Sequence, residues 1–167
     1  QVGPVVTTAI ALMGALGAAA GVLMALLAGF GVDLIHSVPD PQRTVSAVYW
    51  MALAMPFIVL TSGFKGILEA QHAFGVVNAI RFPMGIFTFM GPIAVVTYSS
   101  PRRDIIAAVL AGGRVVACLV HAWYAWRLLP RENGGYRFQS QLLKPLCISG
   151  GWMTLSNIIS PLMGYVD

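Results

Sequence analysis

The chain has 167 residues, of which 57% are hydrophobic and only 10% are charged, and its formal net charge is +4. A soluble domain usually carries about 25% charged residues, so this chain has too little polar surface to cover a water-facing globule. The basic residues are scattered along the sequence, which argues against a nucleic-acid partner. The composition excludes a solvated enzyme and a disordered tail, and it favours an integral membrane protein.

The two ends of the sequence suggest a piece of a longer protein. Gln1 begins the chain without Met and without the charged region that opens a signal peptide, and Asp167 directly follows a long apolar stretch. We therefore expect a fragment. Cys118 and Cys147 lie in apolar runs without a CxxC spacing, so we expect neither a disulfide framework nor a metal site, and no cofactor.

Five stretches are nearly free of charge and long enough to cross the roughly 30 Å of membrane hydrocarbon. They are Val5–Val32, Thr44–Phe64, Phe82–Tyr98 with a start near Val76, Ile105–Trp126, and Pro145–Val166. None of them alternates between polar and apolar residues, as the strands of a membrane barrel would. The sequence thus predicts an all-α fold, a polytopic bundle of transmembrane helices with about five spans.

Short polar connectors separate these stretches, so consecutive helices should be antiparallel. We expect them at His36–Arg43, Glu69–Arg81, Ser99–Asp104 and Arg127–Lys144. The second and fourth connectors and their flanks hold more basic residues than the other two, although Arg102 and Arg103 lie in the third. Because cytoplasmic loops carry an excess of Lys and Arg, this distribution places the second and fourth connectors in the cytoplasm.

The first two predicted spans carry residues that shape helix packing. Gly17 and Gly21 form a small-xxx-small pair, a spacing that lets helix backbones approach closely in lipid. Pro56, Pro92 and Pro161 each remove one hydrogen bond within a predicted span and can kink or hinge it.

Arg114 is the clearest charge at membrane depth, because it lies about midway along the fourth predicted span. An Arg at a helix centre costs about 2.5–3.5 kcal/mol on insertion scales, so it should face a cavity or a partner. At helical spacing it belongs to a stripe of small and polar residues, opposite an apolar face that suits lipid. The stripe comprises Ala107, Ala111, Arg114, Cys118 and His121, and the opposite face comprises Ile106, Val109, Val116, Val120 and Trp123. Two interpretations stay open: a cavity-lining cation for an anionic substrate, or a structural Arg that binds carbonyl groups of a neighbouring helix.

Other polar residues also follow single helix faces. Lys65 and Glu69 are four residues apart and can pair, although a Lys that snorkels to the membrane surface is the simplest interpretation. On the third span the shared face comprises Asn78, Arg81, Gly85, Thr88 and Pro92. On the fifth span, Ser149, Trp152, Ser156, Ser160 and Gly164 share a face, with Asn157 and Asp167 nearby.

Motifs of known enzyme sites are absent from the sequence. The acidic residues lie at span ends or in connectors, and no Walker loop, GxSxG elbow or HExxH helix occurs. We therefore expect no enzyme active site here, whereas ion-driven transport needs only a single acidic group and stays open.

Two segments resemble a known family. Residues 62–74 read SGFKGILEAQHAF and are followed by Val77 and Asn78, similar to the RGxLEGxxxF…N pattern of the polysaccharide (O-antigen-type) flippases. Residues 150–161 read GGWMTLSNIISP and, with Asp167, resemble the GxWxTxSNxxxP…D pattern of that family. These flippases belong to the multidrug/oligosaccharidyl-lipid/polysaccharide exporter superfamily. Lys65 departs from the pattern, in which an Arg is usual at this position. Lys keeps the positive charge but lacks the bidentate fork of Arg.

The resemblance implies that this fragment holds the third to seventh helices of a two-lobe transporter that has twelve or more helices. Residues 1–129 would be the last four helices of the N-terminal lobe, 130–144 the cytoplasmic connector between lobes, and 145–167 the first, truncated helix of the C-terminal lobe. Such a protein is a multi-pass protein of the bacterial inner membrane. It flips polyprenyl-pyrophosphate-linked oligosaccharide from the cytoplasmic to the outer leaflet by alternating access.

The resemblance also suggests roles for the polar residues. In this interpretation the cations Arg114, Arg81 and Lys65 hold the diphosphate of the lipid-linked oligosaccharide. The sugar contacts are expected at Asn78, Trp152, Ser156 and Asn157, and ion coupling (H⁺ or Na⁺) or charge pairing at Glu69 and Asp167. The alternatives are a cation-coupled multidrug exporter of the same superfamily, a membrane-embedded glycan transferase or ligase, and a scaffold without transport activity.

Overall fold

The computed structural model describes residues 2–34, 40–98, 103–129 and 137–151. These residues contain helices and no strand: α1 (Val2–Leu34), α2 (Pro41–Ala70), α3 (Phe74–Tyr98), α4 (Arg103–Leu128) and the short 3₁₀ helix η1 (Ser140–Leu142). Residues 143–151 are also helical. The predicted all-α fold is confirmed. The chain divides into two compact units, residues 13–130 and residues 1–12 with 131–167.

Four of the helices are long and apolar enough to cross a membrane. The shortest of them, α3, has 25 residues and is about 37 Å long, which exceeds the roughly 30 Å of hydrocarbon. The first four predicted spans are therefore confirmed. The fifth, Pro145–Val166, is helical as far as residue 151 and otherwise lies outside the described residues.

The second connector is much shorter than predicted. The expected connector Glu69–Arg81 is wrong, because α2 continues through Glu69 to Ala70 and α3 begins at Phe74. Two backbone hydrogen bonds of 2.9 Å close the end of α2, one from the Ala73 N–H to the Leu68 carbonyl and one from the His72 N–H to the Glu69 carbonyl. This is a Schellman motif, and it reverses the chain within three residues.

His72 occupies the position of this motif that usually holds glycine. Its φ of 57° lies in the left-handed region, where Cβ crowds the following carbonyl. His is among the non-glycine residues that enter this region most often. The completely buried Leu68 lies one turn earlier and anchors the end of α2. The polar residues that follow Glu69 thus belong to a capped turn and to the first turns of α3.

α1 and α2 approach each other closely along small residues. A Cβ atom placed on Gly17 would lie 2.7 Å from the Cα of Pro56, and one on Gly21 would lie 2.5 Å from the carbonyl oxygen of Ala52. Pro56 lies inside α2 and has no N–H to donate to that carbonyl. The absence of a side chain at Gly21 makes room for a carbonyl that α2 does not use for its own hydrogen bond. The packing role predicted for Gly17 and Gly21 is confirmed.

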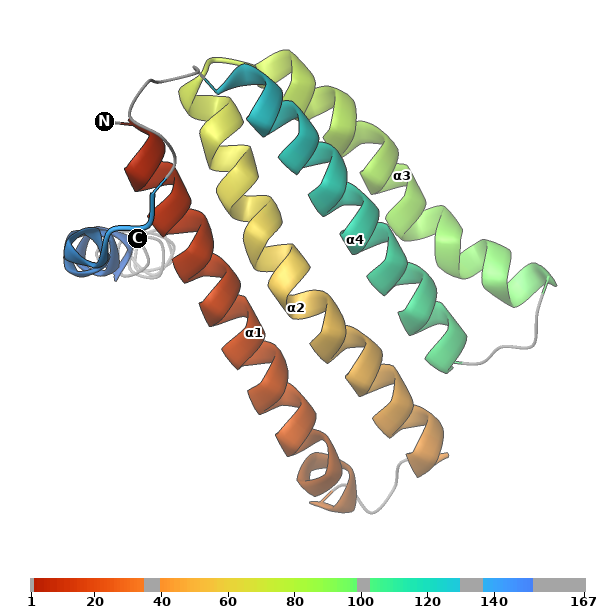
Figure 1. Ribbon diagram of the computed structural model, residues 1–167. Coiled ribbons are helices and arrows are strands. Elements are labelled where there is room, and N and C mark those ends of the chain that lie inside the picture. The colour runs from red at the N-terminus through yellow and green to blue at the C-terminus, as the bar shows by residue number, and fades with distance from the viewer. Residues whose placement is uncertain (1, 35–39, 99–102, 130–136, 152–167) are drawn as a thin grey trace, which may run out of the picture. The chain divides into compact units, whose positions relative to one another are not determined.

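α4 lies between α2 and α3 (Figure 1) and packs most extensively against α2. The stripe predicted on α4 faces this interior, because Ala107, Ala111, Cys118 and His121 are buried, with Arg114 the exception. On the opposite face Val116 and Trp123 are exposed. Against α3, the ring of Phe87 packs on Gly113, where a Cβ atom would collide with it. Small residues thus set the spacing of α4 to both neighbours.

In the second unit, the start of α1 contacts the segment before η1. The buried Thr8 hydroxyl donates a 2.7 Å hydrogen bond to the Pro4 carbonyl and accepts one of 3.0 Å from the Gln139 N–H. The hydroxyl thereby satisfies a backbone group near the end of the predicted interlobe connector.

The α1–α2 contact predicts that the glycines of α1 differ in how much an alanine substitution destabilises the protein. In the full-length protein, Gly17→Ala and Gly21→Ala should each destabilise by about 1–3 kcal/mol, because a methyl group has no room against the α2 backbone. Gly14→Ala is the matched control, since its nearest neighbour is the flexible Leu60 side chain at 3.6 Å. Thermal unfolding in detergent measures the effect. Equal midpoints for all three variants would contradict this packing.

The left-handed backbone conformation of His72 predicts that a glycine at this position stabilises the protein. His72→Gly should raise the unfolding midpoint, because glycine removes about 1 kcal/mol of backbone strain. His72→Ala is the control, since both variants lose the contact with the Phe74 ring (6.1 Å between centroids) but alanine keeps the strain. A glycine variant no more stable than the alanine variant would show that His72 is not strained.

Candidate functional site

Arg114 lies near the middle of α4, and its side chain is exposed in the described structure. It forms no ion pair or hydrogen bond with any residue that the structure describes. The bonding to carbonyls of a neighbouring helix, which the sequence left open, is thus not seen among these residues. Arg114 is a guanidinium at membrane depth with its donors available.

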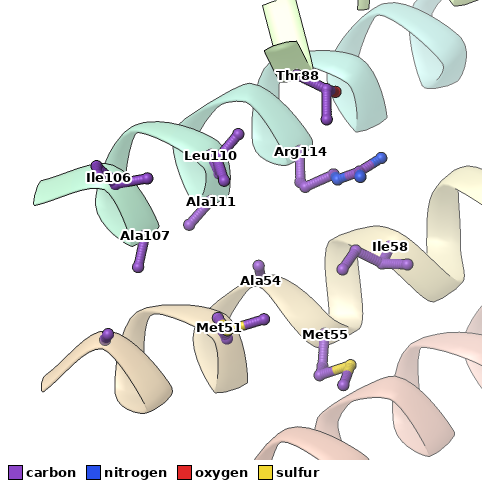
Figure 2. A pocket seen from close by; sticks show the side chains of 11 residues that line it. Met51, Ala54, Met55, Ile58, Thr88, Ile106, Ala107, Leu110, Ala111 and Arg114 are labelled. Atoms are coloured by element: carbon purple, nitrogen blue, oxygen red, sulfur yellow. The ribbon is translucent and has the colours of Figure 1, made fainter. Parts of the chain in front are cut away.

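This guanidinium lines a pocket of 410 Å³ between α2, α3 and α4. Figure 2 shows α2 and α4 on its two sides, with Arg114 and Thr88 near each other. The lining residues come from all three helices: Ala47, Met51, Ala54, Met55 and Ile58 of α2, Thr88 of α3, and Ile106, Ala107, Leu110, Ala111 and Arg114 of α4. All of them except Thr88 and Arg114 are apolar.

Thr88 contributes little donor capacity to this pocket. Its hydroxyl donates a 2.8 Å hydrogen bond to the Met84 carbonyl one turn earlier in α3. The oxygen can still accept a hydrogen bond, but its proton is in use. Arg114 therefore supplies the free hydrogen-bond donors of the pocket, and they carry a positive charge.

Asn78 and Arg81 lie on a different surface. They line a shallow groove of 660 Å³ on α3 together with Phe82, Gly85, Ile86 and Phe89. The predicted common face of Asn78, Arg81 and Gly85 is confirmed, whereas Thr88 turns toward α4. Both Asn78 and Arg81 are exposed. This groove and the Arg114 pocket share no lining residue.

Lys65 lines neither cavity. Its Nζ lies 3.3 Å from Glu69 Oε1, and the two side chains are 42% and 41% exposed, so the pairing that the spacing suggested is confirmed. The three cations predicted to hold one diphosphate thus line different surfaces of the described residues. Four other predicted site residues, Trp152, Ser156, Asn157 and Asp167, lie outside the described residues.

The remaining polar groups of the α4 stripe are engaged within the helix bundle. His121 is buried, and its Nδ1 lies 2.8 Å from the Ala117 carbonyl. The Cys118 side chain is also buried. The described residues hold no group of three or more His, Cys, Asp or Glu side chains that could bind a metal ion.

The α2 side of the Arg114 pocket was missed in the sequence. Met51, Met55 and Ile58 recur at helical spacing, which marks one face of α2 but not the helix that it meets. The structure supplies this information, because α2 and α4 are packed side by side.

The chain is similar to a curated transporter. It is 34% identical over 117 residues, or 70% of its length, to a Shigella flexneri protein named "Putative O-antigen transporter". The chain covers 27% of the length of that relative. No protein-family model matches the chain, and no solved structure matches it significantly. The resemblance to the O-antigen-type flippases is confirmed, and with four spanning helices the chain is part of an integral, multi-pass membrane protein.

The exposed Lys65–Glu69 pair predicts a small effect on stability. Glu69→Gln in the full-length protein should change the free energy of unfolding by no more than about 0.5 kcal/mol, because exposed ion pairs of this spacing are weak. Thermal unfolding in detergent tests this value. A loss well above it would show that the pair is structural, while a loss of transport at unchanged stability would support the predicted coupling role of Glu69.

Proposed function

We propose that the complete protein flips a polyprenyl-pyrophosphate-linked oligosaccharide from the cytoplasmic to the outer leaflet of the bacterial inner membrane. The observation that carries the proposal is Arg114, a guanidinium near the middle of a spanning helix without a partner among the described residues, in a chain similar to an O-antigen transporter. The cargo, the direction and alternating access are parts of this proposal.

The chemistry of the cargo fits such a cation. A diphosphate and its sugars do not cross hydrocarbon unaided, because transfer of unpaired charged and polar groups out of water is very costly. A carrier must offer cations and hydrogen-bond donors in a shielded path. Arg114 has five N–H donors in a planar fork that matches phosphate oxygens.

The other site residues take their places along the same path. Arg81 and Asn78 on α3 and Lys65 at the end of α2 lie nearer the turn 71–73, which the charge distribution places in the cytoplasm. Their separation from Arg114 suits successive contacts during passage rather than one shared diphosphate site. Trp152, Ser156 and Asn157 are proposed sugar contacts, and Glu69 or Asp167 a proposed site for coupling to H⁺ or Na⁺. The two lobes would rock about the connector 130–144.

The main alternative is a cation-coupled multidrug exporter of the same superfamily. A cationic drug calls for carboxylates within the spans, whereas the acidic residues of the described helices lie near helix ends, at Asp33, Glu69 and Asp104. The mid-span charge of this fragment is positive, which favours an anionic substrate. A glycan transferase or ligase would need an active-site loop that bears acidic residues or His, and the given stretch of sequence has no long outer loop.

Substitution of Arg114 tests the proposed function. In the full-length protein, Arg114→Ala should abolish oligosaccharide export while membrane insertion stays intact, because the exposed side chain forms no bond with the part of the chain that the structure describes. Arg114→Lys keeps the charge and should retain part of the activity. Val116→Ala, two residues along α4 on the exposed face, controls for truncation of this helix. Export and membrane-inserted protein are measured in the same cells, and unchanged export by Arg114→Ala would remove this residue from the mechanism.

A further inference from the structure

The Arg114 pocket has a composition poorly suited to sugars. Nine of its eleven lining residues are Ala, Met, Ile or Leu. A sugar presents several hydroxyl groups, each of which loses hydrogen bonds to water in such a pocket. Thr88 has its proton engaged with Met84 and offers only an acceptor. The walls of the pocket therefore match a hydrocarbon chain rather than an oligosaccharide.

The polar groups gather at one end of the pocket. On α4 the lining residues run from Ile106 to Arg114, so the guanidinium lies at the mid-membrane end. Figure 2 shows Thr88 near this end and Ile106 and Ala107 at the far end. On α2 the lining extends to Ala47, close to the start of that helix. The pocket is thus apolar near the starts of α2 and α4 and ends at the Arg114 guanidinium.

We infer that this pocket binds a lipid phosphate at the junction of its anionic group and its hydrocarbon chain, with the phosphate on Arg114 and the first chain units against Met51 and Met55. The occupant is the polyprenyl phosphate part of the cargo, and this inference rests on the proposed function. Its volume of 410 Å³ lies within the range of small-ligand pockets, about 300–1,000 Å³. It accommodates the start of a chain and leaves the sugars to other surfaces.

The direction in which the pocket runs from Arg114 indicates the stage of transport at which it would be occupied. With the orientation proposed above, the chain extends from the mid-membrane cation toward the outer leaflet. A lipid of the cytoplasmic leaflet also has its chain on the outward side of its head group. The pocket would therefore hold cargo that has entered from the cytoplasm and whose chain has not yet turned over.

A binding measurement without sugars tests this inference. The full-length transporter in detergent is titrated with polyprenyl monophosphate, and the bound fraction is read by native mass spectrometry. We expect binding without any sugar and binding of the matching polyprenyl alcohol at least about tenfold weaker, because the charge-assisted bonds to Arg114 are lost. Arg114→Ala should weaken phosphate binding by a similar factor, while Arg114→Lys retains more of it.

A matched pair of tryptophan substitutions separates the pocket from the rest of the surface. Met51→Trp fills the pocket and should weaken polyprenyl phosphate binding by about tenfold or more. Leu53→Trp is the control, because Leu53 lies on the same helix with a similar exposed fraction, 58% against 53%, but does not line the pocket. Equal binding by the two variants would overturn the inference.

Competitors identify the occupant. Free oligosaccharide should not displace polyprenyl phosphate, and phosphatidylglycerol, which has two chains beside its phosphate, should displace it poorly. Displacement by the sugar would show a glycan site, and equal displacement by phosphatidylglycerol would show a site for bulk membrane lipid; either result overturns the inference. Oligosaccharide export is scored separately in cells. Normal export by Met51→Trp with unchanged binding refutes the pocket alone, whereas pocket-dependent binding in a protein without export activity refutes the proposed function alone.

Discussion

The structure depends first on the absence of water in membrane hydrocarbon, where a backbone N–H or C=O group has only the protein as a partner. All four long elements are therefore helices, and they gain stability through close contact rather than through hydrophobic burial. Gly17 and Gly21 let α1 reach the backbone of α2, and Gly113 receives the Phe87 ring between α4 and α3. The Ala52 carbonyl, which Pro56 leaves without its helical donor, lies where Gly21 brings α1 closest to α2. The same glycine contact thus sets the distance between α1 and α2 and makes room for the Ala52 carbonyl.

Against this background Arg114 stands out, because the other groups of its stripe are buried among neighbouring helices while the guanidinium faces a pocket. A charged side chain in the middle of a spanning helix is energetically costly. The apolar walls beside Arg114 favour an occupant that has both an anionic group and a hydrocarbon part. Arg81, Asn78 and Lys65 do not line this pocket, and in the proposed function they contact the cargo on its way to it.

Much of the fold could be predicted from charge-free runs, because a span needs only length and hydrophobicity. The stripe on α4 and the Lys65–Glu69 pair could also be predicted, since both follow from helical spacing within one element. The end of α2 could not, because its Schellman motif uses His72 in place of the usual glycine and a cluster of polar residues was interpreted as a connector. The contact of Met51 and Met55 with the Arg114 pocket could not either, because it depends on which helices are neighbours and on their register, and periodicity fixes neither.

The most direct test of the account is the leaflet distribution of lipid-linked oligosaccharide in a strain that lacks the full-length gene. The account predicts that this lipid accumulates on the cytoplasmic side and that the wild-type gene clears it. No accumulation, combined with altered sensitivity to cationic drugs, would contradict the flippase assignment and favour a multidrug exporter.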